Sequence, residues 1–170
     1  MLLFPKGLDD TMNNVAIMSI KPEYSSKILS HTKKIELRHS SLGLAKDDIV
    51  IVYESAPKQV IGLWFRVMDV ETLPVMEMWE KYSDILGIDR NSYLLYLEGC
   101  TEATGLHIGD TFPLNPPISL NSIKELVPDF VPPQSITWIR DNALRFKSLV
   151  CAISPPLPSD IFSQLCLFSD

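Results

Sequence analysis

Short apolar runs rich in β-branched residues, separated by polar turns, dominate the first half of the chain and predict strands. These runs cover residues 14–20, 49–53 and 59–70. The first run stops at Lys21, because the residue before a proline is disfavoured in helical geometry, and Pro22 can then open a short helix over residues 23–31. Gly62, inside the longest run, indicates a bulge or a close approach of another group to the backbone.

The segment Lys34–Arg38 alternates polar and apolar residues and predicts one more strand. Ile35 and Leu37 should then point into the core, while Lys34, Glu36 and Arg38 line the opposite face. Taken alone, such a charge row is most simply a solvated, self-compensating strand face that adds little stability.

Helical periodicity dominates the second half of the chain. It predicts a helical insertion over residues 74–98, with helices at 74–86 and 91–97, a returning strand at 106–114, and helices at 120–126 and 135–149. Prolines after residue 153 predict a surface tail, which Ile161, Phe162, Leu165 and Leu167 could anchor. The order of elements predicts an α+β fold, with flanking helices and a helical insertion around a small, partly closed β-barrel.

Composition limits the domain count and the classes of partner. The chain has 170 residues, 46% hydrophobic and 21% charged, which fits one globular domain. We expect an N-terminal arm (residues 1–13), a domain (14–153) and a proline-rich tail (154–170). The net charge of −6 gives no general attraction to nucleic acid. Residues 15–66, however, hold eight basic and five acidic side chains, a local +3 that suits a short nucleic-acid ligand better than a long duplex.

Cysteine and leader patterns bear on location and cofactors. Three scattered cysteines, with no CxxC pair and no histidine cluster, predict no metal site, and no other cofactor is indicated. An odd number of thiols without a secretory leader or a membrane span predicts a cytoplasmic protein that does not bind membranes.

The segment Ala16–Arg38 carries a more specific pattern. Lys33, Glu36 and Arg38 occupy three of the four defining positions of the Gly-x-Lys-x-x-Glu-x-Arg motif that follows a helix in ASCH domains. His31 replaces the glycine, at a helix end where a left-handed cap is common and histidine is tolerated better than a β-branched residue. The chain therefore resembles ASCH domains of the PUA-like superfamily, of the stand-alone bacterial or phage type, over roughly residues 14–140.

This resemblance implies a PUA-like barrel with a cleft beside the first helix that binds RNA or a modified nucleobase or nucleoside. Some small members of the family are amidohydrolases that act on an acetylated cytidine through a lysine, a threonine and a glutamate. Lys33 falls on that lysine, but Glu36 stands at the threonine position. A carboxylate cannot replace a hydroxyl nucleophile without a change in chemistry.

The candidate site combines charged groups with aromatic walls. Lys33 and Arg38 can donate to a phosphate or a carbonyl-bearing ring, while Glu36 accepts from an exocyclic amine or orients the lysine. An unstacked base is recognised by such groups together with a flat apolar wall. Further candidates beside the charged groups are Lys21, Tyr24, Tyr53 and Ser55, with Trp64 as an alternative wall and His39 as a possible cleft residue.

Three functions remain open from the sequence. The first is an RNA- or nucleoside-binding protein in RNA metabolism or regulation. The second is a hydrolase acting on a modified nucleoside or on RNA, with Lys33 and Glu36 as an acid/base pair; Lys33 could serve as a base only if burial lowered its pKa. The third is a regulator that docks a protein partner through the insertion at residues 74–98 and whose cleft is vestigial.

Overall fold

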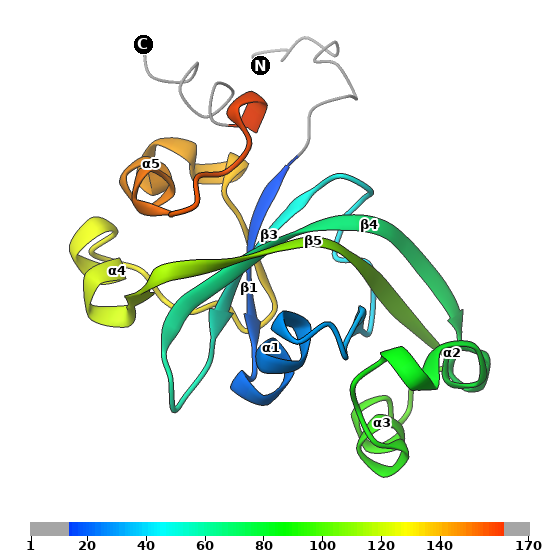
Figure 1. Cartoon of the computed structure of the whole chain (residues 1–170). Coiled ribbons are helices and arrows are strands. Elements are labelled where there is room, and N and C mark those ends of the chain that lie inside the picture. Colours follow the sequence, from blue (N-terminus) through cyan, green and yellow to red (C-terminus); the bar gives the residue numbers. More distant parts are fainter. Residues whose placement is uncertain (1–13, 162–170) are drawn as a thin grey trace, which may run out of the picture.

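A single six-stranded sheet organises the chain (Figure 1). The computed structural model describes residues 14–161. The strands are β1 (Val15–Ile20), β2 (Ile35–Arg38), β3 (Ile49–Glu54), β4 (Val60–Pro74), β5 (Glu102–Ser119) and β6 (Ile136–Trp138). They lie in the order β2-β5-β4-β3-β1-β6; β1 and β3 are parallel and the other neighbours are antiparallel.

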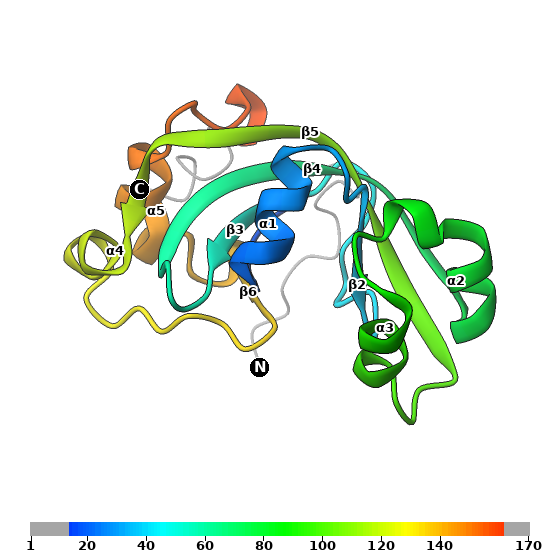
Figure 2. The same ribbon diagram turned by 60° about the horizontal axis from the view of Figure 1, so that its bottom comes forward.

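The predicted barrel is wrong, because the sheet is open. Its two edges are β2 and β6, strands of four and three residues that pair with β5 and β1 but not with each other. The sheet is instead strongly curved, with β4 and β5 bending together along their length (Figure 2). Register shifts between β4 and β5 interrupt the ladder at three places, and such bulges bend strands. The mixed α and β content of the prediction is confirmed, but the closure is not.

Gly62 marks one of these irregularities, as its place in the sequence predicted. The β4–β5 register shifts between Ile61 and Leu63, and a Cβ atom on Gly62 would collide with the Glu54 carboxylate. Glu54 is 3% exposed and its Oε2 lies 2.7 Å from the ammonium of Lys58. The missing side chain at residue 62 therefore makes room for a buried, paired carboxylate.

Helices cover the sheet and extend its long hairpin. They are α1 (Pro22–Leu29), α2 (Val75–Tyr82), η1 (Ser83–Ile85), α3 (Arg90–Tyr96), α4 (Leu120–Leu126), η2 (Arg140–Asn142) and α5 (Ala143–Ala152). The helical insertion is confirmed: α2, η1 and α3 connect β4 to β5 at the far end of the hairpin (Figure 1). No helix within residues 14–161 is long and apolar enough to cross a membrane.

The predicted helix over residues 135–149 is wrong in its first half. Ile136, Thr137 and Trp138 form β6, opposite Met18, Ile17 and Ala16 of β1. The apolar spacing was correct for α5, but the backbone of β1 offers an unpaired edge, and hydrogen bonds to that edge outweigh the local helical pattern. The helix begins only after η2.

Three apolar clusters fill the fold. One lies between the sheet and the helices α4 and α5, a second lies under α1, and a third joins β2 to the insertion. Leu157 and Ile161 are buried in the first cluster, and the Trp64 indole donates to the backbone oxygen of Pro155 at 3.1 Å. Ile161 thus anchors the tail as predicted. Phe162, Leu165, Leu167 and the predicted arm at residues 1–13 lie outside the described residues.

Candidate functional site

A cleft of about 530 Å³ lies beside α1. Its walls come from the end of β1, from α1, from β2 and from the start and end of α3, and Figure 2 shows β2 between α1 and the insertion. The lining includes five of the predicted site residues and a group from the insertion. The predicted ones are Lys21, Tyr24, Lys33, Glu36 and Arg38; the insertion contributes Ile88, Asp89, Ser92, Leu95 and Tyr96.

The turn after α1 places Lys33 in the cleft. His31 adopts the left-handed conformation, with φ of 59°. Its N–H donates to the carbonyl of Ile28, and the N–H of Thr32 donates to the carbonyl of Lys27, which together form a Schellman motif. The motif position occupied by His31 is therefore a helix cap, as the sequence indicated. The chain reverses within this turn, so that Lys33 is buried while its neighbour Lys34 is exposed.

The charged groups of the motif form one connected network. The Nζ atom of Lys33 lies 3.3 Å from Oε2 of Glu36, and Nη2 of Arg38 donates to Oε1 of Glu36 at 2.9 Å. The side chains are 3%, 9% and 13% exposed in the order Lys33, Glu36, Arg38, so this is not the solvated charge row that the strand pattern alone suggested. One carboxylate neutralises part of two buried positive charges.

Burial lowers the pKa of Lys33. The desolvation of its ammonium is the largest cause, and the nearby positive charges of Arg38 and Lys27 act in the same direction. The Glu36 carboxylate opposes the shift through its charge and its hydrogen bond. The direction of this shift is the one that the sequence analysis required for Lys33 to act as a base.

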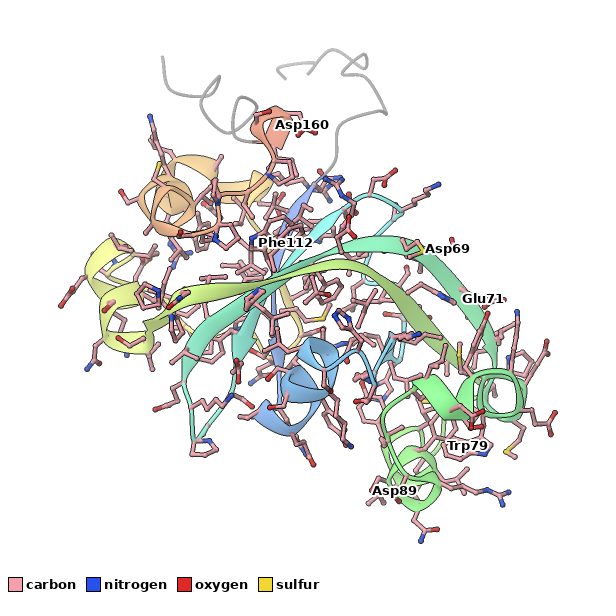
Figure 3. The ribbon with its side chains drawn as sticks, viewed as in Figure 1. Asp69, Glu71, Trp79, Asp89, Phe112 and Asp160 are labelled. Atoms are coloured by element: carbon pink, nitrogen blue, oxygen red, sulfur yellow. The ribbon has the colours of Figure 1, made fainter. Side chains whose placement is uncertain are left out.

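Three consecutive contacts hold the insertion against this network. Nζ of Lys33 donates to the Leu86 carbonyl and Nζ of Lys27 to the Gly87 carbonyl, each at 2.8 Å, and the backbone N–H of Lys34 donates to Ile85 at 2.8 Å. The lysines of the motif segment thus fix the loop that leads into α3. This loop brings Asp89, labelled in Figure 3, to the rim of the cleft, where its carboxylate caps α3 by accepting from Ser92.

Arg38 keeps one buried donor unused. Its Nη2 also donates to the backbone oxygen of Ser19 at 3.0 Å, which ties β2 to the end of β1. Its Nε is buried and, among residues 14–161, has no hydrogen-bond acceptor. A buried polar atom without a partner is uncommon in folded proteins, so this N–H is a donor whose partner the protein groups do not supply.

The structure does not bring every predicted residue into the cleft. Tyr53 is 2% exposed and its ring packs near Phe130 in the cluster under α4 and α5, so it forms no wall of the cleft. Trp64 lies in the same cluster, stacked on Phe112. Strand alternation turns both rings to the opposite face of the sheet. Ser55 is half-buried and outside the lining; only its backbone N–H reaches Ile20, a lining residue.

The aromatic walls are Tyr24 on α1 and Tyr96 on α3. Tyr96 was missed because the apolar run at residues 94–97 was used only to predict a helix over residues 91–97. A short helix cannot bury four consecutive side chains against one surface, and this was the available signal that some of them face a ligand. Within the described residues, no group of three or more potential ligands could hold a metal ion.

Comparison with known proteins identifies the family of this chain. The ASCH domain family model matches residues 18–112, which include the whole motif. An ASCH domain-containing ribonuclease from Zymomonas mobilis is 32% identical over 126 residues, which are 74% of this chain and 84% of that protein. The crystal structure of ASCH from Zymomonas mobilis superposes with a TM-score of 0.75 at 28% identity, covering 83% of this chain and 96% of that one. The chain belongs to the ASCH domain family.

Proposed function

We propose that this protein binds single-stranded RNA in the cleft beside α1 and cleaves it there. The observation that carries the proposal is the buried network of Lys33, Glu36 and Arg38 at the floor of a cleft large enough for one nucleotide. The similarity to a protein named as a ribonuclease, over 84% of that protein's length, supports RNA as the substrate.

The network offers the groups that RNA cleavage needs. The 2′-hydroxyl of one nucleotide attacks the adjacent phosphorus, the O2′–P bond forms and the P–O5′ bond breaks. One group must accept the 2′-hydroxyl proton, another must protonate the departing O5′, and a cation must stabilise the extra negative charge on the phosphate. Glu36 is the proton acceptor, Lys33 the proton donor, and Arg38, whose side chain also lines the cleft, the cation.

Lys33 suits the role of the acid for two reasons. Its ammonium donates to the Leu86 carbonyl and contacts Glu36, so it is held in one place. Burial lowers its pKa, which makes the ammonium a stronger acid than that of a surface lysine. Loss of its proton to O5′ and gain of the 2′-hydroxyl proton by Glu36 balance, and a water molecule returns both groups to their starting states.

Cleavage of a 5′-labelled single-stranded RNA by the purified chain tests this function. Lys33→Met, which preserves the length of the side chain without its charge, should reduce cleavage at least a hundred-fold. Lys34→Met is the matched control, because Lys34 is the exposed neighbour and lies outside the cleft lining. Its activity should stay within about two-fold of wild type, in line with the small effects of most surface substitutions.

The same assay separates the alternatives. Turnover of N4-acetylcytidine, lost in Lys33→Met, would instead assign the cleft to a nucleoside amidohydrolase. RNA binding that weakens with salt but is never followed by cleavage would assign a binding role only. If neither ligand binds to the folded protein, the proposal is wrong, and docking of a protein partner through the insertion becomes the better interpretation.

A further inference from the structure

Helix α3 exposes apolar side chains that the interior does not need. Leu94, Leu95 and Tyr96 are 41%, 72% and 39% exposed. Leu95 and Tyr96 line the cleft, whereas Leu94 points elsewhere on the helix and does not. Adjacent large apolar side chains facing a cleft indicate contact with a ligand rather than with the core.

Tyr96 is fixed in position by three contacts. Its hydroxyl donates to the Leu37 carbonyl at 3.3 Å, and its own carbonyl accepts from Nε2 of His39 at 2.9 Å. The His39 ring also stacks on the Tyr96 ring, with centroids 4.6 Å apart and planes 28° apart. His39 is not part of the cleft lining, so the stack supports the tyrosine from outside the cleft. The ring is thus preorganised, which reduces the entropy that binding would cost.

The opposite wall is different in character. Tyr24 on α1 already has cationic partners, because the ammonium groups of Lys33 and Lys27 lie 5.3 and 5.6 Å from the centre of its ring. Among residues 14–161, the Tyr96 ring stacks only on that of His39. Tyr24 is therefore the wall that contacts the lysine ammonium groups, and Tyr96 is the wall that is open to stacking.

We propose that Tyr96 is a stacking platform for one unpaired nucleobase, and that the helical insertion thereby selects RNA that presents an unpaired nucleotide. The inference rests on the proposed function and names its substrate more closely. A base held in a duplex is stacked on both faces and cannot enter a cleft of about 530 Å³ beside Tyr96, whereas a bulged or single-stranded base can.

A short RNA duplex with one bulged nucleotide tests the platform, because it offers a single unpaired base in a single register. A 2′-deoxy sugar at the bulge prevents attack by the 2′-hydroxyl, so that equilibrium binding can be measured. Wild type should bind the bulged duplex at least ten-fold more tightly than the fully paired one, since stacking of one base on an aromatic side chain contributes roughly that factor or more.

The coupling between protein and base gives the sharpest result. Tyr96→Leu should remove most of the preference for the bulged duplex, and so should an abasic bulge with wild-type protein. The two changes together should cost no more than either alone, because both remove the same stack. Tyr96→Phe should keep the preference, and Leu94→Ala, on the same helix but outside the cleft, is the matched control.

Two outcomes would contradict the inference in distinguishable ways. If Tyr96→Leu keeps the preference, or its loss adds to that of the abasic bulge, Tyr96 is not the platform; cleavage that is lost in Lys33→Met then leaves the proposed function intact. If folded wild type binds and cleaves none of the RNAs, both proposals fail together. Should Tyr96→Leu not fold, equal binding of the intact and abasic bulges by wild type overturns the inference on its own.

Discussion

The ammonium of Lys33 lies 3.3 Å from Oε2 of Glu36, and the guanidinium of Arg38 lies 2.9 Å from the other oxygen of the same carboxylate. Each side chain is at most 13% exposed, so water screens these charges only weakly. Glu36 is therefore the electrostatic centre of the cleft. Removing it leaves two buried cations facing each other, whereas removing either cation leaves a carboxylate that still has one partner.

Glu36→Ala should destabilise the fold more than any other single change in the network. Loss of the anion of a buried ion pair typically costs several kcal/mol, and we expect a reduction of roughly 3 kcal/mol in the free energy of unfolding. Urea denaturation followed by circular dichroism measures it. Glu36→Gln keeps an acceptor for Arg38 and Lys33 but not the charge, so it should cost less than Glu36→Ala.

Lys34→Ala serves as the stability control for this prediction. Lys34 is exposed one residue from Lys33, and its substitution should change the free energy of unfolding by no more than about 0.5 kcal/mol. Equal effects of Glu36→Ala and Lys34→Ala would mean that the network is as solvated as an ordinary surface and that its burial has been overestimated.

The lowered pKa of Lys33 can be observed directly. In protein labelled with ¹³C-lysine, the Cε resonance of Lys33, assigned through Lys33→Arg, should titrate at lower pH than that of lysine in an unfolded peptide. Glu36→Gln should move the Lys33 midpoint lower still, because the carboxylate is the group that raises it against the effect of burial. A midpoint that rises in Glu36→Gln would contradict this electrostatic account.

The same shift predicts how stability and activity depend on pH. Since folded Lys33 holds its proton less tightly than unfolded lysine, the unfolded state binds more protons between the two pKa values. Within that window the free energy of unfolding of wild type should rise with pH relative to Lys33→Met, and below it the difference should be constant. RNA cleavage should fall as pH rises through the lowered pKa, because the acid is lost.

The floor of the cleft was predicted from the resemblance to ASCH domains, which rests on residues close together in the chain, whereas strand alternation alone predicted a solvated charge row. The position of His31 marked a helix end, the spacing of Lys33, Glu36 and Arg38 marked the charged group, and the periodicity after Pro74 marked the insertion. Each depends on interactions between residues close in the chain, namely helix capping, strand alternation and helical spacing. Such interactions can be predicted from the sequence without knowledge of the tertiary fold.

The features that the sequence did not reveal depend on contacts between distant residues. Sheet closure is decided by whether the edge strands β2 and β6 meet, and β6 forms only because β1 offers its edge. Tyr53 is an aromatic residue of the kind that can form the wall of a cleft. Strand alternation in β3, which pairs with β1, turns its ring to the face of the sheet that packs against α4 and α5. Tyr96 reaches the cleft through a loop anchored by Lys27 and Lys33, about sixty residues earlier in the chain.

His31→Gly should stabilise the protein. His31 occupies the left-handed C′ position of the Schellman motif, with φ of 59°, which costs a non-glycine residue roughly 1 kcal/mol. Glycine removes that cost but increases the entropy of the unfolded chain, so a net gain of about 0.5 kcal/mol is expected in urea denaturation. Ser30→Gly is the control: Ser30 has φ of −83°, and glycine there should bring no gain.

Gly87 and Gly99 separate backbone conformation from crowding at the cleft. Both have positive φ, 68° and 79°, so alanine at either position is strained by a similar backbone cost of about 1 kcal/mol. A Cβ on Gly87, however, would lie 2.7 Å from Cβ of Lys33, whereas a Cβ on Gly99 would meet nothing within 4 Å.

Gly87→Ala must therefore move either the loop or Lys33, and it should lower RNA cleavage at least ten-fold while Gly99→Ala leaves cleavage close to wild type. The free energy of unfolding, measured in parallel, should fall further in Gly87→Ala than in Gly99→Ala, because the collision adds to the shared backbone cost. Equal cleavage by the two variants would show that the position of Lys33 against the loop does not limit the reaction. The Gly87 carbonyl also accepts from Lys27, so a shift of this loop in Gly87→Ala would disturb the contact that the loop makes with Lys27 as well as its contact with Lys33.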